Sequence, residues 1–376
     1  MEALLQQGIR LVEASAYILP TAPLVKYRVT GLRQDAQGRI IAPNRIIAKL
    51  SRSEVARRFL EPPPAKVLKK LAEAGEITKE EAHLAKFIPL AQDITAEADS
   101  GGHTDHRAAL SVLPTLQKLR DEIQSKYDYA DTPRIGLAGG IGTPHAAAAA
   151  FAMGAAYIVT GSINQACVEA GTSRLVREML AQAAQTDVTD APAADMFEMG
   201  VKVQVLKKGT RFPERAAKLY EIFKQYGSIE AIPSEERDKI EETIFRDTLD
   251  DVWDKTAAFF EDRNPRQIEK AEADPKHKLA LICRCYLGSA AHWANNGIED
   301  RKEDFQIWCG PAMGAFNDWT RGSYLETLEN RKVADVAKQL LYGAALLLQE
   351  QSLQTQGVAM PAAPSWRTPT QLEVRS

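Results

Sequence analysis

A histidine that directly follows two glycines is the pattern in this chain that points most clearly to chemistry. Residues 100–106 read Ser-Gly-Gly-His-Thr-Asp-His and follow an alternating run, 93–99, that is typical of a strand. Gly101 and Gly102 would let the backbone pass close to a flat ligand, with His103 aimed at that ligand. An imidazole can donate or accept a proton near neutral pH. The alternative is a turn histidine held by backbone hydrogen bonds.

Two further glycine turns fit a phosphate group. Gly139 and Gly140 follow the apolar run 134–138 and precede an alanine-rich helix, while Gly161 and Ser162 follow the run 156–160. Backbone N–H groups at such turns bind anions, and barrel folds commonly hold phosphate after their last two strands. Together the three segments predict a flavin phosphate site beside a catalytic histidine. The alternative is a pair of ordinary strand-to-helix turns.

A nicotinamide-binding Rossmann site is disfavoured at the second of these turns. The glycines at 140 and 142 do not complete the dinucleotide fingerprint, because position 145 is histidine.

Composition limits the classes of protein to consider. The chain has 376 residues, is 45% hydrophobic and carries a net charge of −3, so nothing favours binding to nucleic acid or an anionic membrane. Four scattered cysteines do not make a secreted disulfide framework. The N-terminus lacks the features of a signal peptide, and no apolar window is long enough to span a membrane. We therefore expect a cytoplasmic protein.

The order of the predicted elements indicates a parallel α/β fold. Apolar runs predict strands at 9–16, 45–50, 93–99, 134–138 and 156–160, with helical stretches between them. Capping boxes at 51–54 and 78–81 predict helix starts, and residues 29–41 predict a hairpin. Chemistry-bearing residues that follow strand ends favour a (β/α)8 TIM-type barrel, of which these would be about the last five strands.

Helical periodicity predominates after about residue 167. Apolar stripes cover 219–226, 240–260 and 333–344, and Pro213 stands where a helix starts. We divide the chain into residues 1–190, the C-terminal portion of a flavin-binding barrel, 191–360, a helical domain, and 361–376, a disordered tail.

Cys283 and Cys285 lie two apart on a predicted helix, so they cannot bind one metal ion together and are interpreted as packing residues. Six basic residues between 202 and 218 form either a solvated face or a docking patch for an acidic partner.

Long strings of the sequence resemble the PfaD family of trans-acting, FMN-dependent enoyl reductases of polyunsaturated fatty acid and polyketide synthases, which is related to nitronate monooxygenases. The resemblance covers nearly the whole chain. Its strings are residues 12–16, 97–105, 138–144, 159–167, 193–202 and 308–317.

The resemblance implies roles for the residues singled out above. His103 would be the acid that protonates the substrate or the group that orients it. Gly101, Gly102, Gly139, Gly140, Gly161 and Ser162 would contact FMN. Lys49, at the end of its strand, would lie near the flavin N1 and C2 carbonyl, although a surface lysine is an equal alternative from the residues alone. NADPH or NADH would be the reductant, and an acyl carrier protein would present the enoyl thioester.

Two departures from the family pattern stand out. Members carry a longer N-terminal part with the first three barrel strands, so the chain resembles a fragment or a split subunit closed by a separate chain. The family motif also has asparagine where this chain has His106. The alternative functions are a non-catalytic remnant or assembly partner, and a nitronate monooxygenase-like flavin oxygenase.

Overall fold

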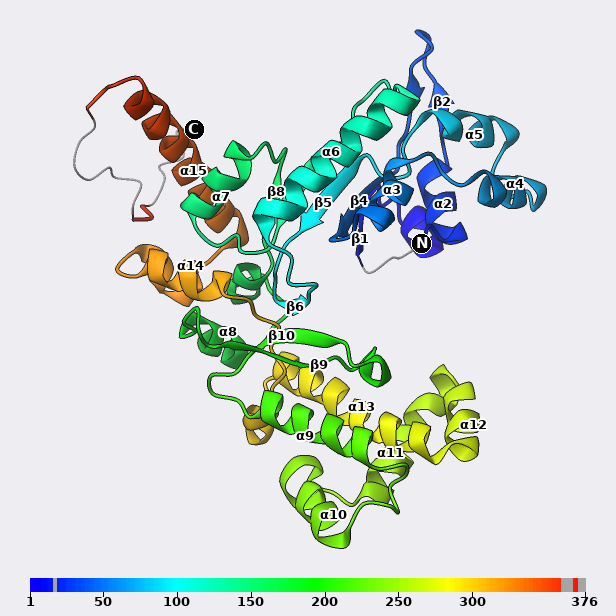
Figure 1. Cartoon of the computed structure of the whole chain (residues 1–376), viewed down its shortest axis with the longest axis vertical. Coiled ribbons are helices and arrows are strands. Elements are labelled where there is room, and N and C mark those ends of the chain that lie inside the picture. Colours follow the sequence, from blue (N-terminus) through cyan, green and yellow to red (C-terminus); the bar gives the residue numbers. More distant parts are fainter. Residues whose placement is uncertain (16–18, 360–367, 371–376) are drawn as a thin grey trace. The chain divides into compact units, whose positions relative to one another are not determined.

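A five-stranded parallel sheet forms the first of two units of the protein (Figure 1). The computed structural model describes residues 1–15, 19–359 and 368–370. The strand order is β1-β4-β5-β7-β8, and every pairing is parallel. The strands are β1 (Leu11–Ser15), β4 (Arg45–Leu50), β5 (Asp93–Glu97), β7 (Arg134–Ala138) and β8 (Ile158–Val159). The predicted partial TIM-type barrel of about five strands is thereby confirmed.

The two faces of this sheet differ in chemistry. Ala48, Ile94 and Leu137 belong to the face that joins one buried apolar cluster, which the surrounding helices share. The helices of this unit are α1 (Glu2–Gln6), α2 (Ala22–Val29), α3 (Ser53–Leu60), α4 (Ala65–Glu73), α5 (Lys79–Leu84), α6 (Ala109–Tyr127) and α7 (Pro144–Ala152). The residues that alternate with that apolar set are largely polar, and they include Lys49, Thr95 and Glu97.

One of the two predicted capping boxes is confirmed and the other is wrong. The Thr78 hydroxyl accepts from the N–H of Glu81, whose carboxylate accepts from the N–H of Thr78. Helix α3 instead has Arg52 as its N-cap, without a side-chain cap. The Ser51 hydroxyl donates to the carboxylate of Asp105 and does not cap the helix. The predicted hairpin is present as β2 (Arg33–Gln34) and β3 (Ile40–Ile41).

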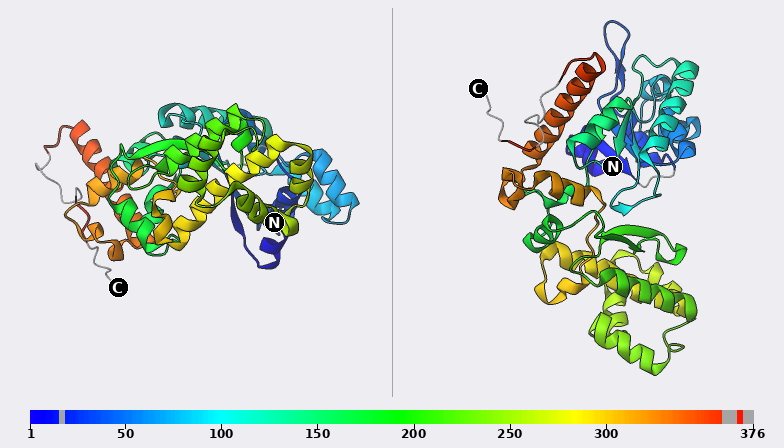
Figure 2. Two further views of the ribbon diagram at one scale, coloured as in Figure 1. Left: turned by 90° about the horizontal axis from the view of Figure 1, so that it is seen from below. Right: turned by 60° about the vertical axis from the view of Figure 1, so that its left-hand side comes forward.

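The second unit is mostly helical, as predicted, and its helices α9 and α13 lie side by side (Figures 1 and 2). It contains residues 161–343 and the short segment Ser100–Thr104. It therefore includes 161–190, which the sequence predicts as part of the barrel, whereas 344–358 of the predicted helical domain belongs to the first unit. Its α-helices are α8 (Arg174–Ala181), α9 (Phe212–Gln225), α10 (Ser234–Ile240), α11 (Leu249–Arg263), α12 (Arg266–Ala273), α13 (Pro275–Asn296), α14 (Ala312–Thr320) and the start of α15 (Val333–Thr355).

Two features of this unit were not predicted. A three-stranded antiparallel sheet joins β6 (Gly102–His103), β10 (Lys202–Leu206) and β9 (Val188–Pro192) in that order. The apolar stripe at 240–260 is also divided, because α10 continues into a π-helical turn, Glu241–Phe245, that ends at Arg246 in the left-handed region. The predicted tail, 361–376, lies outside the described residues apart from 368–370.

In the part of the chain that the structure describes, no helix is both long enough and apolar enough to cross a membrane.

Candidate functional site

His103 lies on the short strand β6, where backbone pairing sets its position. It is paired with Val203 of β10, and Gly102 is paired with Gln204. The backbone of Leu206 donates to Ile307 at 2.9 Å, and that of Cys309 donates to Gln204 at 3.2 Å. The segment around Trp308 therefore runs beside β10 and next to the glycine-histidine strand.

The imidazole of His103 has two side-chain neighbours within the second unit. Its Nε2 lies 3.0 Å from the Asp195 Oδ1. The Trp308 ring meets the imidazole edge to face, with a centroid separation of 5.4 Å and an interplanar angle of 82°. An edge-to-face contact is a favourable aromatic geometry. The histidine is thus held by side chains rather than by backbone bonds, which disfavours the interpretation as a simple turn residue.

Asp195 and Trp308 were not singled out by reasoning from residue types. Both lie within strings that carry the family resemblance, residues 193–202 and 308–317. Asp195 and Trp308 are far from His103 in the sequence. They come close to it because β6 pairs with β10, which no local sequence pattern predicts. The family strings were the only available signal.

Gly101 and Gly102 have a packing role in this structure. A Cβ on Gly101 would lie 2.8 Å from the backbone of Cys309 and Gly310, and one on Gly102 would lie 2.8 Å from the Trp308 ring. Gly102 also has a φ of +81°, which disfavours any side chain. The close approach expected to a flat ligand is therefore made to the segment 308–310. Contact of these two glycines with FMN stays a prediction.

Gly161 and Ser162 lie beside the same segment. The Gly310 N–H donates to the Ser162 hydroxyl oxygen at 2.9 Å, and the Gln165 side-chain amide donates to the Trp308 carbonyl at 2.6 Å. A Cβ on Gly161 would meet nothing within 4 Å. The backbone at this turn is open to a ligand, and the Ser162 hydroxyl still has a proton to donate. These residues fit a phosphate group.

Gly139, Gly140 and Lys49 belong to the first unit. Gly139 has a φ of +94°, and a Cβ there would lie 2.6 Å from the Ala98 carbonyl oxygen. Gly140 has a φ of +73° with nothing within 4 Å of its Cβ position, so its backbone is open to a ligand as well. The turn precedes α7, whose N-cap hydroxyl, on Thr143, accepts from Ala146.

Lys49 is neither a free surface lysine nor an unpartnered one. Its ammonium forms a short ion pair with Glu97 of the adjacent strand, and both side chains are largely buried. Both residues lie at the carboxyl ends of parallel strands, the edge at which parallel α/β folds bind ligands. A cofactor at Lys49 would therefore also meet the carboxylate of Glu97.

The residues on either side of the segment Ser100–Thr104 belong to the first unit and form side-chain contacts within it. Asp105 accepts hydrogen bonds from the Arg52 guanidinium through both of its oxygens, each at 3.0 Å. These bonds lower the pKa of Asp105 to about 2. His106 has a φ of +51° and places its Nδ1 2.9 Å from Asp99. Asparagine and histidine both tolerate this left-handed conformation better than most residues.

Thiolate chemistry is disfavoured at this site. Cys309 follows Trp308 directly but is fully buried, and burial raises the pKa of its thiol to about 12. Cys283 of α13 is buried in the apolar core, which raises the pKa of its thiol to about 12. Cys285 is only partly buried, so the two side chains point to different sides of the helix, as their spacing predicts.

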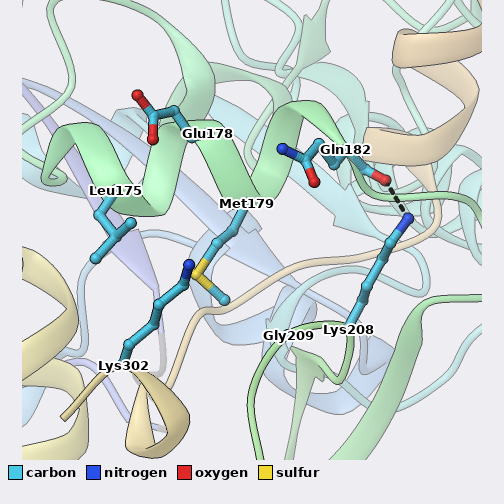
Figure 3. Close-up of a pocket in the computed structure, with 7 residues that line it drawn as sticks. All are labelled: Leu175, Glu178, Met179, Gln182, Lys208, Gly209 and Lys302. Carbon is cyan, nitrogen blue, oxygen red and sulfur yellow. Dashed lines mark hydrogen bonds between the residues drawn. The ribbon is translucent and has the colours of Figure 1, made fainter. Parts of the chain in front are cut away.

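Most of the basic segment at 202–218 is used within the protein. Arg215 is buried against Asp304, Lys218 pairs with Glu236, and Arg211 pairs with Glu214. Lys208 donates to the Gln182 carbonyl at 2.7 Å and lies at one side of a pocket lined by α8 residues and Lys302 (Figure 3). Docking of an acidic partner at this segment stays a prediction.

The fold and site together are those of a barrel-type α/β protein followed by a helical part. Similarity to known proteins identifies the family. The enoyl reductase domain of MlnA, from the macrolactin biosynthesis cluster of Bacillus amyloliquefaciens, is 43% identical, with a TM-score of 0.89 over 94% of this chain and 79% of that one. The chain belongs to the PfaD-like enoyl reductase family.

Two curated relatives and one family model also match this chain. A polyunsaturated fatty acid synthase subunit of Thraustochytrium sp. is 49% identical over 354 residues, 92% of this chain and 24% of that protein. The polyketide biosynthesis protein PksE of Bacillus subtilis is 48% identical over 350 residues, 93% of this chain and 45% of that protein. The chain thus spans less than half the length of either. Residues 226–305 match the model of the inserted helical domain of [acyl-carrier-protein] S-malonyltransferase.

Proposed function

We propose that the protein is an FMN-dependent enoyl reductase that acts in polyketide or polyunsaturated fatty acid synthesis. The observation that carries the proposal is the arrangement at His103, whose imidazole is held by Asp195 and Trp308. The segment that contains Trp308 also bonds to Ser162, beside the open turn at Gly161. The substrate would be an enoyl thioester on an acyl carrier protein. Reduction of its 2,3-double bond needs a hydride at the β-carbon and a proton at the α-carbon.

The chain's own residues supply binding groups and the proton. Backbone N–H groups at Gly140 and Gly161, with the Ser162 hydroxyl, would bind the FMN phosphate, because each turn is open to a ligand. Lys49 would lie near the flavin ring and is oriented by Glu97. His103 would protonate the α-carbon. Bound FMN, reduced by NADPH or NADH, supplies the hydride.

We further propose that additional strands close the five-stranded sheet, either within a longer polypeptide or from a separate chain. Among the described residues, β1 pairs only with β4 and β8 pairs only with β7. Parallel sheets with unpaired outer strands present open backbone donors and acceptors to a partner. Activity assays therefore include the protein with and without a polypeptide segment that would supply these strands.

The test combines flavin binding with substrate reduction. The purified protein, alone and with that segment, is titrated with FMN, and enoyl thioester reduction is followed with NADPH or NADH. We expect FMN binding, and a fall in kcat of at least about a hundredfold in His103→Gln. Gly161→Ala should weaken FMN binding without creating a steric clash inside the protein, because its Cβ position is empty.

The same assays decide between the alternatives. Absence of FMN binding in both preparations would contradict the proposal and favour a non-catalytic assembly partner. Oxidation of nitroalkanes by O₂ without enoyl reduction would instead favour the nitronate monooxygenase-like function.

A further inference from the structure

The contact between His103 and Asp195 determines which imidazole nitrogen carries the proton. The Nε2 of His103 lies 3.0 Å from the Asp195 Oδ1. An ionised carboxylate can only accept a hydrogen bond, so Nε2 must be the donor. We propose that Asp195 is a positioning residue that fixes His103 as the Nε2–H tautomer, which leaves Nδ1 to exchange a proton with the substrate. The inference deepens the proposed function and rests on it for the identity of the substrate.

The surroundings of the imidazole agree with this assignment. About a third of the His103 side chain is exposed, and none of the residues that the structure describes hydrogen-bonds to Nδ1. Trp308 limits the rotation of the ring by its edge-to-face contact. The pairing of β6 with β10 fixes the backbone from which the side chain projects. Nδ1 is thus the nitrogen available for chemistry.

The position of Asp195 depends on its turn rather than on the strength of the ion pair. Its side chain is 61% exposed, and an exposed pair contributes little stability. Two residues further along, Phe197 is fully buried and packs on Tyr220 and Phe223 of α9, with ring centroids 5.3 and 5.2 Å away. These buried contacts anchor the turn.

An ion pair provides the second anchor of this turn. Glu198 accepts from the Arg284 guanidinium of α13 at 3.2 Å, and His277 of the same helix lies 3.7 Å from the same oxygen. The helical part of the protein therefore holds the carboxylate that orients His103. This gives α9 and α13 a role in the chemistry although neither one touches the imidazole.

The proton step balances with this tautomer. After a hydride from a reduced flavin has reached the β-carbon, the substrate is an enolate with negative charge shared between the α-carbon and the thioester oxygen. The Nδ1–H bond of the His103 imidazolium breaks and a C–H bond forms at the α-carbon. The imidazole that remains is neutral and keeps its proton on Nε2, bonded to Asp195. Water returns a proton to Nδ1 before the next cycle.

Nitrogen NMR tests the tautomer without any reaction. The six histidines are labelled with ¹⁵N, and the His103 signals are assigned by their loss in His103→Gln. At alkaline pH we expect the wild-type protein to carry the proton on Nε2 alone, and Asp195→Ala to show both tautomers. A proton on Nδ1 in the wild type, or an unchanged pattern in Asp195→Ala, would overturn the proposal. Asp254→Asn removes an exposed carboxylate of the same unit and should change nothing.

Kinetics of the FMN-loaded enzyme give an independent test. Asp195→Asn should lower kcat by about tenfold or more and leave KM within about twofold, because the variant affects proton transfer and not substrate binding. Arg284→Lys should retain more activity than Arg284→Ala, since only lysine can still pair with Glu198. Enoyl reduction that is equally fast in Asp195→Asn refutes the inference but leaves the proposed function intact. An inactive wild type with the Nε2–H tautomer refutes the proposed function alone.

Discussion

Asp105 shows how a single residue can anchor the chain next to His103. Its carboxylate accepts from Arg52 and Ser51, which lowers its pKa to about 2 from an ordinary value of 3.8. A lowered pKa means that the pair stabilises the fold above about pH 4 and that this contribution disappears as the pH falls from 4 towards 2. Because Arg52 is half exposed, solvent screening reduces the expected contribution to about 1 kcal/mol.

We therefore predict that Asp105→Asn lowers the free energy of unfolding by about 1 kcal/mol at pH 7. The difference from wild type should shrink between pH 4 and pH 3. Urea unfolding at several pH values measures it. A difference that stays constant with pH would show that the charge on Asp105 contributes nothing. Asp254→Asn, the exposed control, should have no effect at any of these pH values.

Gly139 and Gly140 require glycine for different reasons: both have a positive φ, but only Gly139 also lacks space for a side chain. Both have positive φ, so alanine at either position costs about 1–2 kcal/mol of backbone strain. Only at Gly139 does the added Cβ also collide with backbone, 2.6 Å from the Ala98 carbonyl oxygen. We predict that Gly139→Ala destabilises the protein clearly more than Gly140→Ala in thermal or urea unfolding. Equal losses would mean that the turn can move away from Ala98.

At the scale of the element, Glu81 connects α5 to the hairpin. One carboxylate oxygen completes the capping box with Thr78, and the other accepts from the Gly31 N–H at 2.6 Å. Glu80, the preceding residue in the same first turn, is exposed and has neither contact. We predict that Glu81→Ala costs about 1–2 kcal/mol of unfolding free energy, and Glu80→Ala less than about 0.5 kcal/mol. If both variants cost the same, only the helix dipole is involved.

The elements also show how far the sequence can predict the fold. The runs that form the parallel sheet and the Thr78 capping box are local patterns, and the sequence predicts the ends of these strands to within two residues. The predicted cap of helix α3 is wrong because the Ser51 hydroxyl donates to Asp105, which lies more than fifty residues away in the sequence. Strands β9 and β10 were missed, although Val203 and Val205 alternate with polar residues, because helical periodicity on either side dominated the interpretation.

The candidate site was predictable only in part for a related reason. His103 and the glycine turns were found because each follows a strand end, which is visible along the sequence. Asp195 and Trp308 reach His103 through antiparallel pairing of segments about a hundred and two hundred residues apart. Such pairing has no local signature, so reasoning from residue types could not place either one.

At the scale of the whole molecule, the two units have separate apolar cores, and one buried charge cluster belongs only to the second. Asp304 has no exposed surface and accepts from Arg215, from Arg301 at 3.2 Å and from the Tyr286 hydroxyl at 2.7 Å. These partners come from α9, the segment before Trp308, and α13. Removing one member of a buried charge cluster leaves the remaining charges uncompensated, which costs about 3–5 kcal/mol.

Tryptophan fluorescence can assign that loss to one unit, because the tryptophans that the structure describes, at positions 253, 293, 308 and 319, all belong to the second unit. We predict that Asp304→Asn lowers the urea midpoint measured by fluorescence, while amide hydrogen exchange in β5 and β7 stays as slow as in wild type at low urea. Leu287, Phe305 and their neighbours would lose protection first, because the charge cluster is embedded among them. Loss of protection in both units at the same urea concentration would mean that they unfold as one cooperative body, and the stability of the parallel sheet would then depend on a carboxylate that none of its own strands contains.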